Sequence, residues 1–477
     1  MLLSKLIERI TTVENDMEIS FVTDDSRKVK NGCAFVCIKG NSFDGHTAAL
    51  QAEQNGASVI IAEHDTGAKN QIIVPDTRRA YSVICAAFYG YPSEQLKLIG
   101  LTGTNGKTTS AFLIKDLFEH LGHRTGLIGT VQNMAGDKVY PAHYTTPDSQ
   151  ELQFLFSEMV KEKCEYCVME VSSQALAQGR VDGCHFDIAL FTNLTQDHLD
   201  YHSTFENYLQ AKKILFKNAD KAVLNIDDPN AMRMVKDTDC SVITFSTKLD
   251  TADYTAKNIR YKPYGVEYEL VGESQIGRVK IGIPGGFSVY NSMGAFLCAL
   301  AAGYDFAEIL SAIAESKGVK GRIEVVPTNT DYTVIIDYAH SPDGLENILS
   351  SLREFSENRI ICVFGCGGDR DKTKRPIMGR IVSKMADVAV VTSDNPRSED
   401  PKSIIDDVLE GMREAEILVH TVVNRAEAIR FAMEIAEKGD IVLLAGKEHE
   451  TYQVLNTGKI HFDEREIVNE ILVDKKL

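Results

Sequence analysis

The segment from Ile99 to Phe112, IGLTGTNGKTTSAF, most constrains the fold, because an apolar strand runs into a glycine-rich turn and then into a helix. Unpaired backbone N–H groups at such a helix start can surround a polyphosphate. A lysine there places positive charge on the β and γ oxygens, and the next hydroxyl binds Mg²⁺. Leu101 stands where the common P-loop pattern has its first glycine. The segment predicts a nucleoside triphosphate site made by Gly103, Thr104, Asn105, Gly106, Lys107, Thr108 and Thr109.

Length and charge limit the class of protein. The 477 residues, 44% of them hydrophobic, suffice for about three domains. The net charge of −17 argues against a nucleic-acid partner, so anionic substrates need local clusters of arginine and lysine. Residues 1–16 show an amphipathic helix pattern without a signal-peptide core, and no apolar run reaches ~18 residues. We therefore expect a soluble cytoplasmic protein with reduced cysteines and no membrane partner.

Strands and helices alternate along the whole chain, in three regions. Residues 1–95 alternate short strands with helices, up to a turn at 91–93. Residues 96–322 carry the phosphate turn, then parallel-type strands, then antiparallel strands over 253–283. Residues 323–477 repeat strand and helix. This order predicts an α/β fold of three domains, with a central P-loop-type mixed sheet and a C-terminal Rossmann-like domain.

Polar runs follow the predicted strands, where ligands of such sheets bind. The runs are 170–173, 192–198, 337–340, 366–371, 394–397 and 446–450. One such run is ordinary loop chemistry, but six of them across two domains indicate a ligand cleft between the domains.

The motifs resemble those of the Mur ligases, the ATP-dependent amide-forming enzymes of peptidoglycan precursor synthesis, over nearly the whole chain. They are TGTNGKTT (102–109), TTPDS (145–149), MEVSSQAL (169–176), TNLTQDHLDYH (192–202), YLQAKKILF (208–216), VKGRIE (319–324), DYAHSPD (337–343), GCGGDRDKTKRP (365–376), DNPRSEDP (394–401) and GKEHE (446–450). The resemblance implies a ligase that adds meso-2,6-diaminopimelate to UDP-MurNAc-L-Ala-D-Glu through an acyl phosphate. It also implies a UDP-substrate domain (1–95), an ATP domain (96–322) and an amino-acid domain (323–477), acting as a monomer.

The resemblance also assigns the chemistry of the site. The implied catalytic residues are Lys107, Glu170, His198 and Lys212. The implied Mg²⁺ ligands are Thr108, Glu170, His198 and Lys212, the last as N6-carboxylysine, a carbamate formed with CO₂. A protonated lysine would repel the metal, whereas a carbamate offers an acidic oxygen on a long arm. Carbamate formation needs the neutral amine, whose pKa is lowered by nearby cations.

The resemblance also implies residues that bind ATP and residues that bind the UDP-linked dipeptide. Besides the turn, the implied ATP-binding residues are Asn291, Arg322, Asp337 and His340. The family's usual first asparagine before Asn291 is replaced by Ser288, for which a helix cap is an equally good interpretation. The implied residues for UDP-MurNAc-dipeptide are Ser26, Asn41, Ser42, Phe43, Thr145, Thr146, Ser172, Gln178 and Arg180. Arg180 suits a pyrophosphate or carboxylate, because its planar fork binds such groups bidentately.

The residues that would bind the incoming amino acid distinguish between the alternative functions that remain. The implied diaminopimelate-binding residues are Arg370, Asp394, Asn395, Pro396, Arg397, Gly446 and Glu450. Arg397 would clamp the distal carboxylate, which lysine lacks, so the DNPR loop should reject lysine. Its alternative role is a salt bridge with Glu399 or Asp400, and Glu448 departs from the family's glycine. A lysine-adding ligase, folylpolyglutamate synthetase and a catalytically silent nucleotide-binding homologue remain as alternatives.

Overall fold

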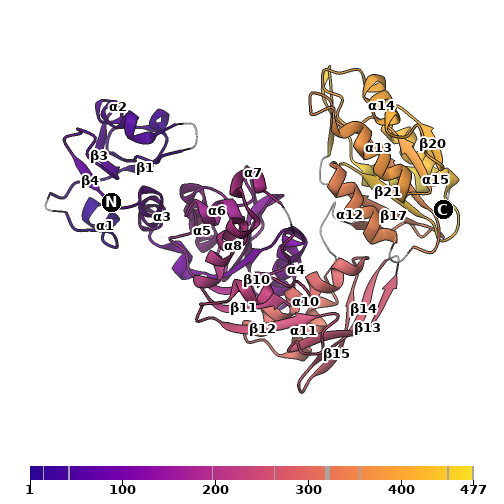
Figure 1. Ribbon diagram of the computed structural model, residues 1–477, viewed down its shortest axis with the longest axis horizontal. Coiled ribbons are helices and arrows are strands. Elements are labelled where there is room, and N and C mark those ends of the chain that lie inside the picture. The colour runs from indigo at the N-terminus through magenta and orange to yellow at the C-terminus, as the bar shows by residue number, and fades with distance from the viewer. Residues whose placement is uncertain are drawn as a thin grey trace. The chain divides into compact units, whose positions relative to one another are not determined.

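The computed structural model describes residues 1–13, 15–40, 43–195, 197–262, 264–316, 323–353, 356–447 and 451–474. Figure 1 shows the helices and strands of the chain in order of residue number. The chain divides into two compact units. The first unit comprises Met1–Thr255 and Met293–Ala312, and the second comprises Ala256–Ser292 and Ile313–Leu477. Among the described residues, no helix has both the length and the apolar character that crossing a bilayer requires.

The first unit begins with a small parallel sheet in the order β1-β2-β3-β4. Its strands are β1 (Phe21–Thr23), β2 (Cys33–Val36), β3 (Ala57–Ala62) and β4 (Gln71–Ile73). The helices are α1 (Leu3–Leu6), α2 (Ala49–Gln54) and α3 (Thr77–Phe88), with 3-10 turns η1 (Ser26–Lys28), η2 (Gly45–Ala48) and η3 (Pro92–Gln95). The helix expected over 1–16 is therefore much shorter, because the chain folds back and Leu3 N donates to Met17 O.

The larger sheet of the first unit has the order β13-β12-β11-β10-β5-β9-β6-β7-β8. Its strands are β5 (Lys97–Thr102), β6 (Thr125–Ile128), β7 (Gln132–Ala135), β8 (Lys138–Pro141), β9 (Tyr166–Glu170), β10 (Phe186–Phe191), β11 (Ala219–Asn225), β12 (Ser241–Ser246) and the start of β13 (Tyr254–Lys262). The helices are α4 (Lys107–His120), α5 (Ser149–Lys161), α6 (Ser173–Ala177), α7 (Leu199–His202), α8 (Phe205–Lys217) and α9 (Ala231–Met234). The unit also holds α10 (Gly286–Ala301) from Met293 on and α11 (Phe306–Ile313) up to Ala312, whereas the first part of α10 belongs to the second unit. The β6-β7-β8 pairs are antiparallel and the others are parallel, which makes this a mixed sheet.

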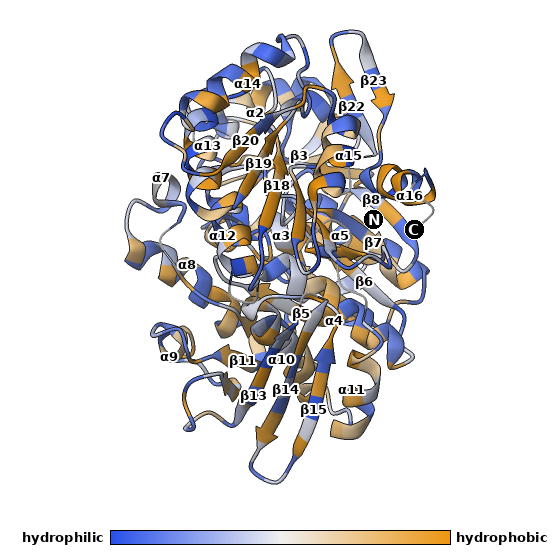
Figure 2. Cartoon of the chain, turned by 90° about the vertical axis from the view of Figure 1, so that its right-hand side faces the viewer, coloured by the Kyte–Doolittle hydropathy of each residue, from blue (hydrophilic) through white to orange (hydrophobic). Residues whose placement is uncertain are grey.

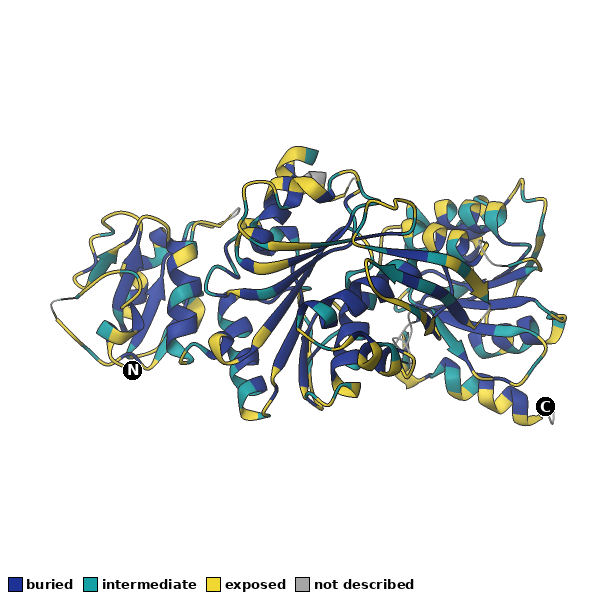
Figure 3. Ribbon diagram, turned by 90° about the horizontal axis from the view of Figure 1, so that it is seen from below, coloured by how far each residue is buried: buried dark blue, intermediate teal, exposed yellow. Residues whose placement is uncertain are grey.

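The register of this sheet gathers the expected site residues. Leu101 of β5 lies beside Glu170 of β9, and Thr102 lies beside Phe191 of β10. The three parallel strands thus end at one edge. Figure 3 shows the strands largely in the dark blue of buried residues, so polar side chains at their ends are held by a rigid core.

Helix α3 joins the small sheet to the larger one, because it packs against α5. Gln150 Nε2 donates to Val22 O at 3.0 Å. Ser82 Oγ also accepts from Gly183 N at 2.9 Å. These contacts hold the N-terminal sheet against segments that carry the expected substrate residues.

The second unit holds the rest of β13 and the antiparallel hairpin β14 (Gly265–Gly272) and β15 (Ile276–Ile281). Its main sheet has the order β16-β17-β21-β18-β19-β20, which is parallel except for the β16–β17 pair. The strands are β16 (Glu324–Val326), β17 (Thr333–Asp337), β18 (Ile360–Phe364), β19 (Val388–Val391), β20 (Leu418–Thr421) and β21 (Ile441–Ala445), followed by the hairpin β22 (Tyr452–Leu455) and β23 (Gly458–His461). The helices are α12 (Pro342–Arg353), α13 (Lys374–Met385), α14 (Pro401–Glu410), α15 (Arg425–Ile435) and α16 (Glu464–Asp474).

Strands of this second sheet are apolar on both faces, as Figure 2 shows in orange for β18 and β19. Strands buried on both faces are typical of a parallel sheet covered by helices. The α/β class, the central mixed sheet and the Rossmann-like C-terminal region are thus as the sequence predicted. The boundaries expected near residues 95 and 322 stay predictions.

Candidate active site

The glycine-rich turn between β5 and α4 is fixed by its neighbours. Gly106 precedes the helix at φ 83°, a left-handed conformation that glycine adopts without strain. A Cβ on Gly103 would lie 2.0 Å from Thr192 Oγ1, so a larger residue does not fit. Thr104 N and Asn105 N donate to the carbonyl and side-chain oxygens of Asn193, each at 2.9 Å. The turn is therefore held open by the segment after β10.

Two lysines converge on this turn. Lys107 Nζ donates to Gly103 O and Thr104 O, each at 2.9 Å. Lys212 Nζ, from α8, donates to the same Gly103 O at 2.8 Å and lies 3.5 Å from Thr102 Oγ1. Burial lowers the pKa of the Lys107 amine. Burial, and then the charge of Lys107, hold the pKa of the Lys212 amine well below its ordinary value. The site therefore favours a neutral amine at Lys212.

Lys212 and its neighbour Lys213 differ in surroundings, although both are buried. Lys212 is 2% exposed and its Nζ lies 4.6 Å from the centre of the Tyr208 ring. Lys213 Nζ instead pairs with Asp237 at 3.3 Å. Of these two lysines, Lys212 bonds to the phosphate turn and Lys213 does not.

Glu170, at the end of β9, forms a compact oxygen cluster. Its Oε2 accepts from Thr108 Oγ1 and Thr130 Oγ1, each at 3.1 Å, and its Oε1 accepts from Thr130 N at 3.0 Å. Glu170 is 1% exposed, and no ion pair of the described residues involves it. A buried carboxylate without a counterion is costly, and oxygen donors are what Mg²⁺ prefers. The chemistry of this donor set fits Mg²⁺.

His198 takes a different position. Its backbone is left-handed at φ 51°, and its half-exposed ring lies 3.4 Å from Asp197. In the described part of the chain, no hydrogen bond or ion pair joins His198 to Thr108 or Glu170. Nor do the described residues include a cluster of three histidine, cysteine or acidic side chains suited to a metal. The structure thus brings together Thr108 and Glu170, but not all four expected ligands.

One cavity of about 370 Å³ connects the phosphate turn with the expected muramoyl-dipeptide residues. Its lining includes the expected residues Gly103, Lys107, Thr145, Thr146, Ser172, Gln178, Arg180, His198 and Lys212. It also includes Tyr144, Ser173, Gln174, Tyr201 and Tyr208, which sequence analysis did not single out. The cavity thus unites residues that lie more than 100 positions apart in the sequence.

Arg180 is held at this cavity by neutral partners. Its Nη1 donates to Thr146 O at 2.8 Å, and its Nε and Nη2 donate to Gln178 Oε1 at 3.0 and 2.8 Å. Thr146 Oγ1 donates to Glu170 O at 2.8 Å and accepts from Ser172 N at 3.0 Å. The bonds donated by Arg180 orient its guanidinium, and their acceptors are neutral oxygens that do not offset its positive charge.

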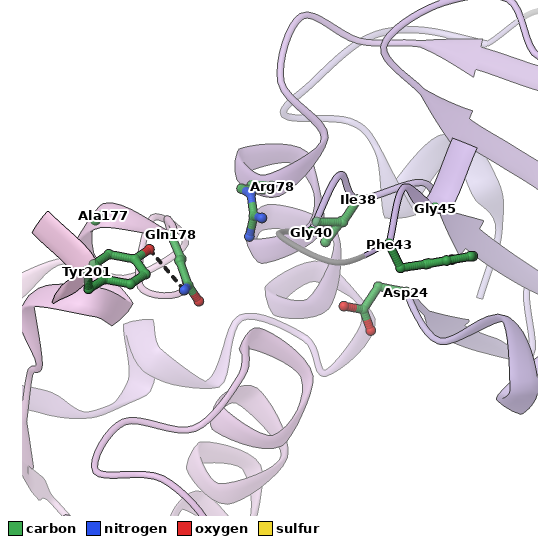
Figure 4. A pocket seen from close by; sticks show the side chains of 9 residues that line it. All are labelled: Asp24, Ile38, Gly40, Phe43, Gly45, Arg78, Ala177, Gln178 and Tyr201. Atoms are coloured by element: carbon green, nitrogen blue, oxygen red, sulfur yellow. Dashed lines mark hydrogen bonds between the residues drawn. The ribbon is translucent and has the colours of Figure 1, made fainter. Parts of the chain in front are cut away.

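Two further cavities, of about 440 and 180 Å³, lie where the small sheet meets the segment around Gln178 (Figure 4). Phe43 is 56% exposed and lines the larger one, whereas Ser26, in η1, lines neither. The expected residues Asn41 and Ser42 lie outside the described residues.

In the second unit, the expected nucleotide residues lie on α10 and at the end of β17. Asn291 is buried on α10. Asp337 accepts from Ile323 N and Ala339 N, each at 2.9 Å. His340 is exposed and packs on Tyr338, with ring centres 4.2 Å apart. Arg322 lies outside the described residues.

Ser288 lies inside helix α10 rather than at its cap. Its Oγ donates to Pro284 O at 2.9 Å, a bond back to the preceding turn. The capping interpretation of Ser288 is therefore wrong. The hydroxyl instead donates to a carbonyl oxygen just before the first residue of the helix.

The DNPR loop, 394–397, is tied to two other segments. Lys447 pairs with Asp394 at 3.1 Å and donates to Asn395 Oδ1 at 2.8 Å. Asn395 Oδ1 also accepts from Val454 N at 2.9 Å. Gly446 follows β21 with a left-handed φ of 116°. A Cβ added to Gly446 would lie 3.9 Å from Asp394 Oδ2. Pro396 completes the turn, whereas Glu448 and Glu450 lie outside the described residues.

Arg397 has a left-handed backbone at φ 53°, and its Nη1 donates to Gly368 O at 2.8 Å. Glu399, its expected alternative partner, is bound by Arg375 at 2.8 Å and by Lys372 at 3.1 Å. Within the described ranges, no carboxylate pairs with Arg397. Its remaining guanidinium donors are thus available to an anionic ligand. Arg370 is exposed in the neighbouring loop.

Comparison with known families places this site in context. Three family models match the chain: the Mur ligase family catalytic domain (18–89), the Mur ligase middle domain (101–299) and the Mur ligase glutamate ligase domain (321–448). The chain belongs to the Mur ligase family. The "UDP-N-acetylmuramoyl-L-alanyl-D-glutamate--2,6-diaminopimelate ligase" of Clostridium botulinum is 47% identical to it over 479 residues, which is 99% of each chain. The protein of the same name from Bacillus licheniformis is 45% identical over 491 residues and 100% of each chain.

Solved structures agree with this assignment. A structure of a UDP-N-acetylmuramoyl-L-alanyl-D-glutamate--2,6-diaminopimelate ligase has a TM-score of 0.77 at 33% identity and covers 100% of both chains. The MurF ligase of Thermotoga maritima, solved in complex with ADP, has a TM-score of 0.57 at 19% identity and covers 96% of this chain and 98% of its own. The latter likeness concerns the fold alone.

Several residues of the ligase's site escaped sequence analysis. Thr130 binds both oxygens of Glu170, yet only its place after a predicted strand could have drawn attention to it. Lys447 lies inside the GKEHE motif, and its two contacts with the DNPR loop give that position a structural role. Arg78 and Asp24 line cavities, but neither carries a motif signal.

Proposed function

We propose that this Mur ligase joins meso-2,6-diaminopimelate to the D-glutamate carboxylate of UDP-MurNAc-L-Ala-D-Glu, with conversion of ATP to ADP and phosphate. The carboxylate attacks the γ phosphorus, so that an acyl phosphate forms and ADP leaves. The amine then attacks the acyl carbon, loses a proton and expels phosphate. Relatives 45–47% identical over the whole chain carry the name of this activity. The observation that carries the proposal is the single cavity shared by Lys107, Lys212 and Arg180.

The phosphate turn brings two anions together, and cationic groups make this tolerable. N–H groups at the start of α4 and the amine of Lys107 would neutralise the triphosphate, while Arg180 would hold the anionic UDP-linked substrate. Mg²⁺ bound by Thr108 and Glu170 would polarise the transferred phosphoryl group. Thr130 would keep the Glu170 carboxylate turned toward Thr108, because it donates to both carboxylate oxygens. His198 would act from the half-exposed rim of the cavity.

Lys212 is proposed to carry a carbamate. The neutral amine attacks CO₂, a C–N bond forms, and one proton leaves to solvent. Burial and the nearby Lys107 support this step, since both lower the pKa of the Lys212 amine. The product is an anion beside the positive charge of Lys107, which favours its retention, and it would serve as a further Mg²⁺ ligand.

The acceptor amino acid is proposed to bind at the DNPR loop. Arg397 would hold the distal carboxylate of diaminopimelate with Arg370, while Asp394, Asn395, Pro396, Gly446 and Glu450 shape the pocket. Lysine lacks that carboxylate, so it would leave the Arg397 fork without a partner. The absence of a carboxylate partner for Arg397 among the described residues supports this assignment.

The remaining expected residues complete the proposal. Asn291, Arg322, Asp337 and His340 would bind ATP, and Ser26, Asn41, Ser42, Phe43, Thr145, Thr146, Ser172 and Gln178 would bind the UDP-linked dipeptide. The family-model matches support a division into a UDP-substrate domain (1–95), an ATP domain (96–322) and an amino-acid domain (323–477). Because the proposed substrates include ATP and a nucleotide sugar, we infer a cytoplasmic enzyme, acting as a monomer since one chain supplies all these residues.

The proposed reaction is tested with purified protein, ATP, Mg²⁺ and UDP-MurNAc-L-Ala-D-Glu. Amino acids are added singly and phosphate release is followed, with mass spectrometry of the product. Turnover with meso-diaminopimelate and background release with L-lysine are expected. Equal turnover with both amino acids would overturn the acceptor assignment. Absence of ADP formation with the complete set would overturn the ligase assignment itself.

A further inference from the structure

Arg78 lies in the first turn of α3 and lines both cavities beside the small sheet. Figure 4 shows it between the Gln178–Tyr201 pair and the loop that carries Ile38 and Gly40. Its Nη2 donates to Lys39 O at 2.6 Å, which fixes the guanidinium near that loop. The remaining donors of its fork stay available to a ligand.

Arg78 and Arg180 face the same cavity of about 180 Å³. The positive charge of Arg78 even opposes that of Arg180, because it is one of the influences that lower the pKa of Arg180 after burial, the largest. Among the described residues, neither arginine forms an ion pair with a carboxylate. Two like charges without a bridging anion make a site that an anionic group would stabilise.

Two acidic residues line this cavity as well, Asp24 and Asp148. Burial, and then the charge of Asp148, raise the pKa of the Asp24 carboxyl, so Asp24 opposes an anion less than an exposed aspartate does. Asp148 caps α5, where it accepts from Glu151 N at 2.9 Å, and its charge acts to raise the pKa of Arg180. Asp148 therefore offsets part of the positive charge at Arg180, whereas no ion pair of the described residues involves Arg78.

We propose that Arg78 binds the diphosphate of the UDP-linked substrate, an inference that rests on the proposed function. Arg78 is common to the larger cavity, lined also by Phe43 of the loop expected to bind the UDP moiety, and the smaller cavity, lined also by Arg180 and Tyr144. The diphosphate is the link between the uridine and muramoyl halves of that substrate. A guanidinium common to both cavities matches the position and the charge of that link.

Arg79 offers a matched control one residue away. It is 73% exposed and pairs with Asp182 at 2.9 Å, outside both cavities. The variants are therefore Arg78→Ala, Arg78→Lys and Arg79→Ala in the full chain. The readouts are the affinities for UDP and uridine by NMR titration, and KM for each of the three substrates.

Arg78→Ala should weaken UDP binding and raise KM for the UDP-linked dipeptide about 10- to 100-fold, as expected for loss of a charge-assisted pair. Uridine affinity, KM for ATP and KM for diaminopimelate should stay within about twofold, as should all values for Arg79→Ala. Arg78→Lys should fall between, because lysine keeps the charge but lacks the fork.

Equal loss of uridine and UDP affinity would overturn the inference, since Arg78 would then only tether the loop through Lys39 O. UDP affinity of Arg78→Ala that matches Arg79→Ala would overturn it too. Unchanged UDP affinity with a raised KM would mean that Arg78 holds a peptide carboxylate, which also contradicts it. If the wild type binds UDP but does not turn over, the proposed reaction fails while the UDP titration still decides the role of Arg78.

Discussion

Lys107 and Lys212 donate to one and the same carbonyl oxygen, that of Gly103, at 2.9 and 2.8 Å. Two ammonium groups at this separation repel each other, which is why Lys107 contributes to the lowered pKa of the Lys212 amine. The arrangement favours one charged and one neutral amine. Modification of the neutral one would turn repulsion into attraction.

Lys212→Ala should lower kcat about 100-fold or more, as expected for loss of a preorganised anionic group in the site. Millimolar acetate or formate should restore part of the rate, because a small carboxylate can enter the space left by the side chain. Rates in CO₂-depleted and bicarbonate-supplemented buffer are compared, and ¹³CO₂ labelling of the wild type is followed by NMR.

Lys213→Ala is the matched control, since Lys213 pairs with Asp237 instead of facing the turn. It should keep near wild-type activity. The carbamate signal should fade as the pH is lowered, because protonation of the Lys212 amine competes with its reaction with CO₂. A labelled wild-type protein without a carbamate signal during turnover would contradict the assignment.

Glu170→Gln should raise the Mg²⁺ concentration for half-maximal rate about tenfold or more, because the buried oxygen cluster loses its charge. Thr130→Ala should have a smaller effect in the same direction, since Thr130 only orients Glu170. Initial rates over a Mg²⁺ titration measure both. Identical titration curves for Glu170→Gln and the wild type would remove Glu170 from the metal site.

Arg397→Ala should raise KM for meso-diaminopimelate about 10- to 100-fold and leave KM for ATP unchanged, because a bidentate contact to the distal carboxylate is lost. Discrimination against lysine should shrink correspondingly. Arg380→Ala, on the exposed side of α13, serves as the control. A variant at Arg397 that still rejects lysine as strongly as the wild type would disprove the clamp.

Glu399, two residues after the DNPR loop, should make the stability of the fold depend on pH. Its hydrogen bonds with Arg375 lead the causes that lower the pKa of its carboxyl from 4.5 to about 2. The stabilisation is complete above the unfolded pKa of 4.5 and is lost as the pH falls through about 2. Glu399→Gln should therefore lower Tm at pH 7, and the difference from the wild type should shrink below pH 4.5. Scanning calorimetry measures it, with Glu410→Gln, an exposed residue, as the control.

Local patterns predicted the secondary structure well where one segment decides the outcome. The strand–turn–helix at 99–112 and the parallel strands after it needed only apolar periodicity and glycine spacing. Residues 1–16 were mispredicted because Met17 O accepts from Leu3 N, so the chain must reverse direction between these residues and cannot continue as one helix. Apolar periodicity does not report such a pairing.

Prediction of the site residues depended on motifs rather than on local patterns. Lys212 was assigned through the resemblance of its motif, YLQAKKILF, because a lysine in a helix pattern is by itself no sign of a site. Thr130, Lys447 and Arg78 were missed because their significance comes from partners 40, 52 and 39 positions away. The occupation of Glu399 by Arg375, which leaves Arg397 to a ligand, likewise depends on tertiary packing.

The cavities at Arg78 are walled by residues from before position 82 and by residues from 144 to 201, so no contiguous stretch of the gene encodes a complete pocket. Recombination that exchanges only the first ninety codons between two relatives would therefore produce mismatched halves. If these cavities bind the UDP-linked substrate as proposed, changes in specificity for that substrate must involve both stretches together. A hybrid enzyme with a transplanted specificity would need Tyr144, Gln178, Arg180 and Tyr201 from the same parent as Arg78.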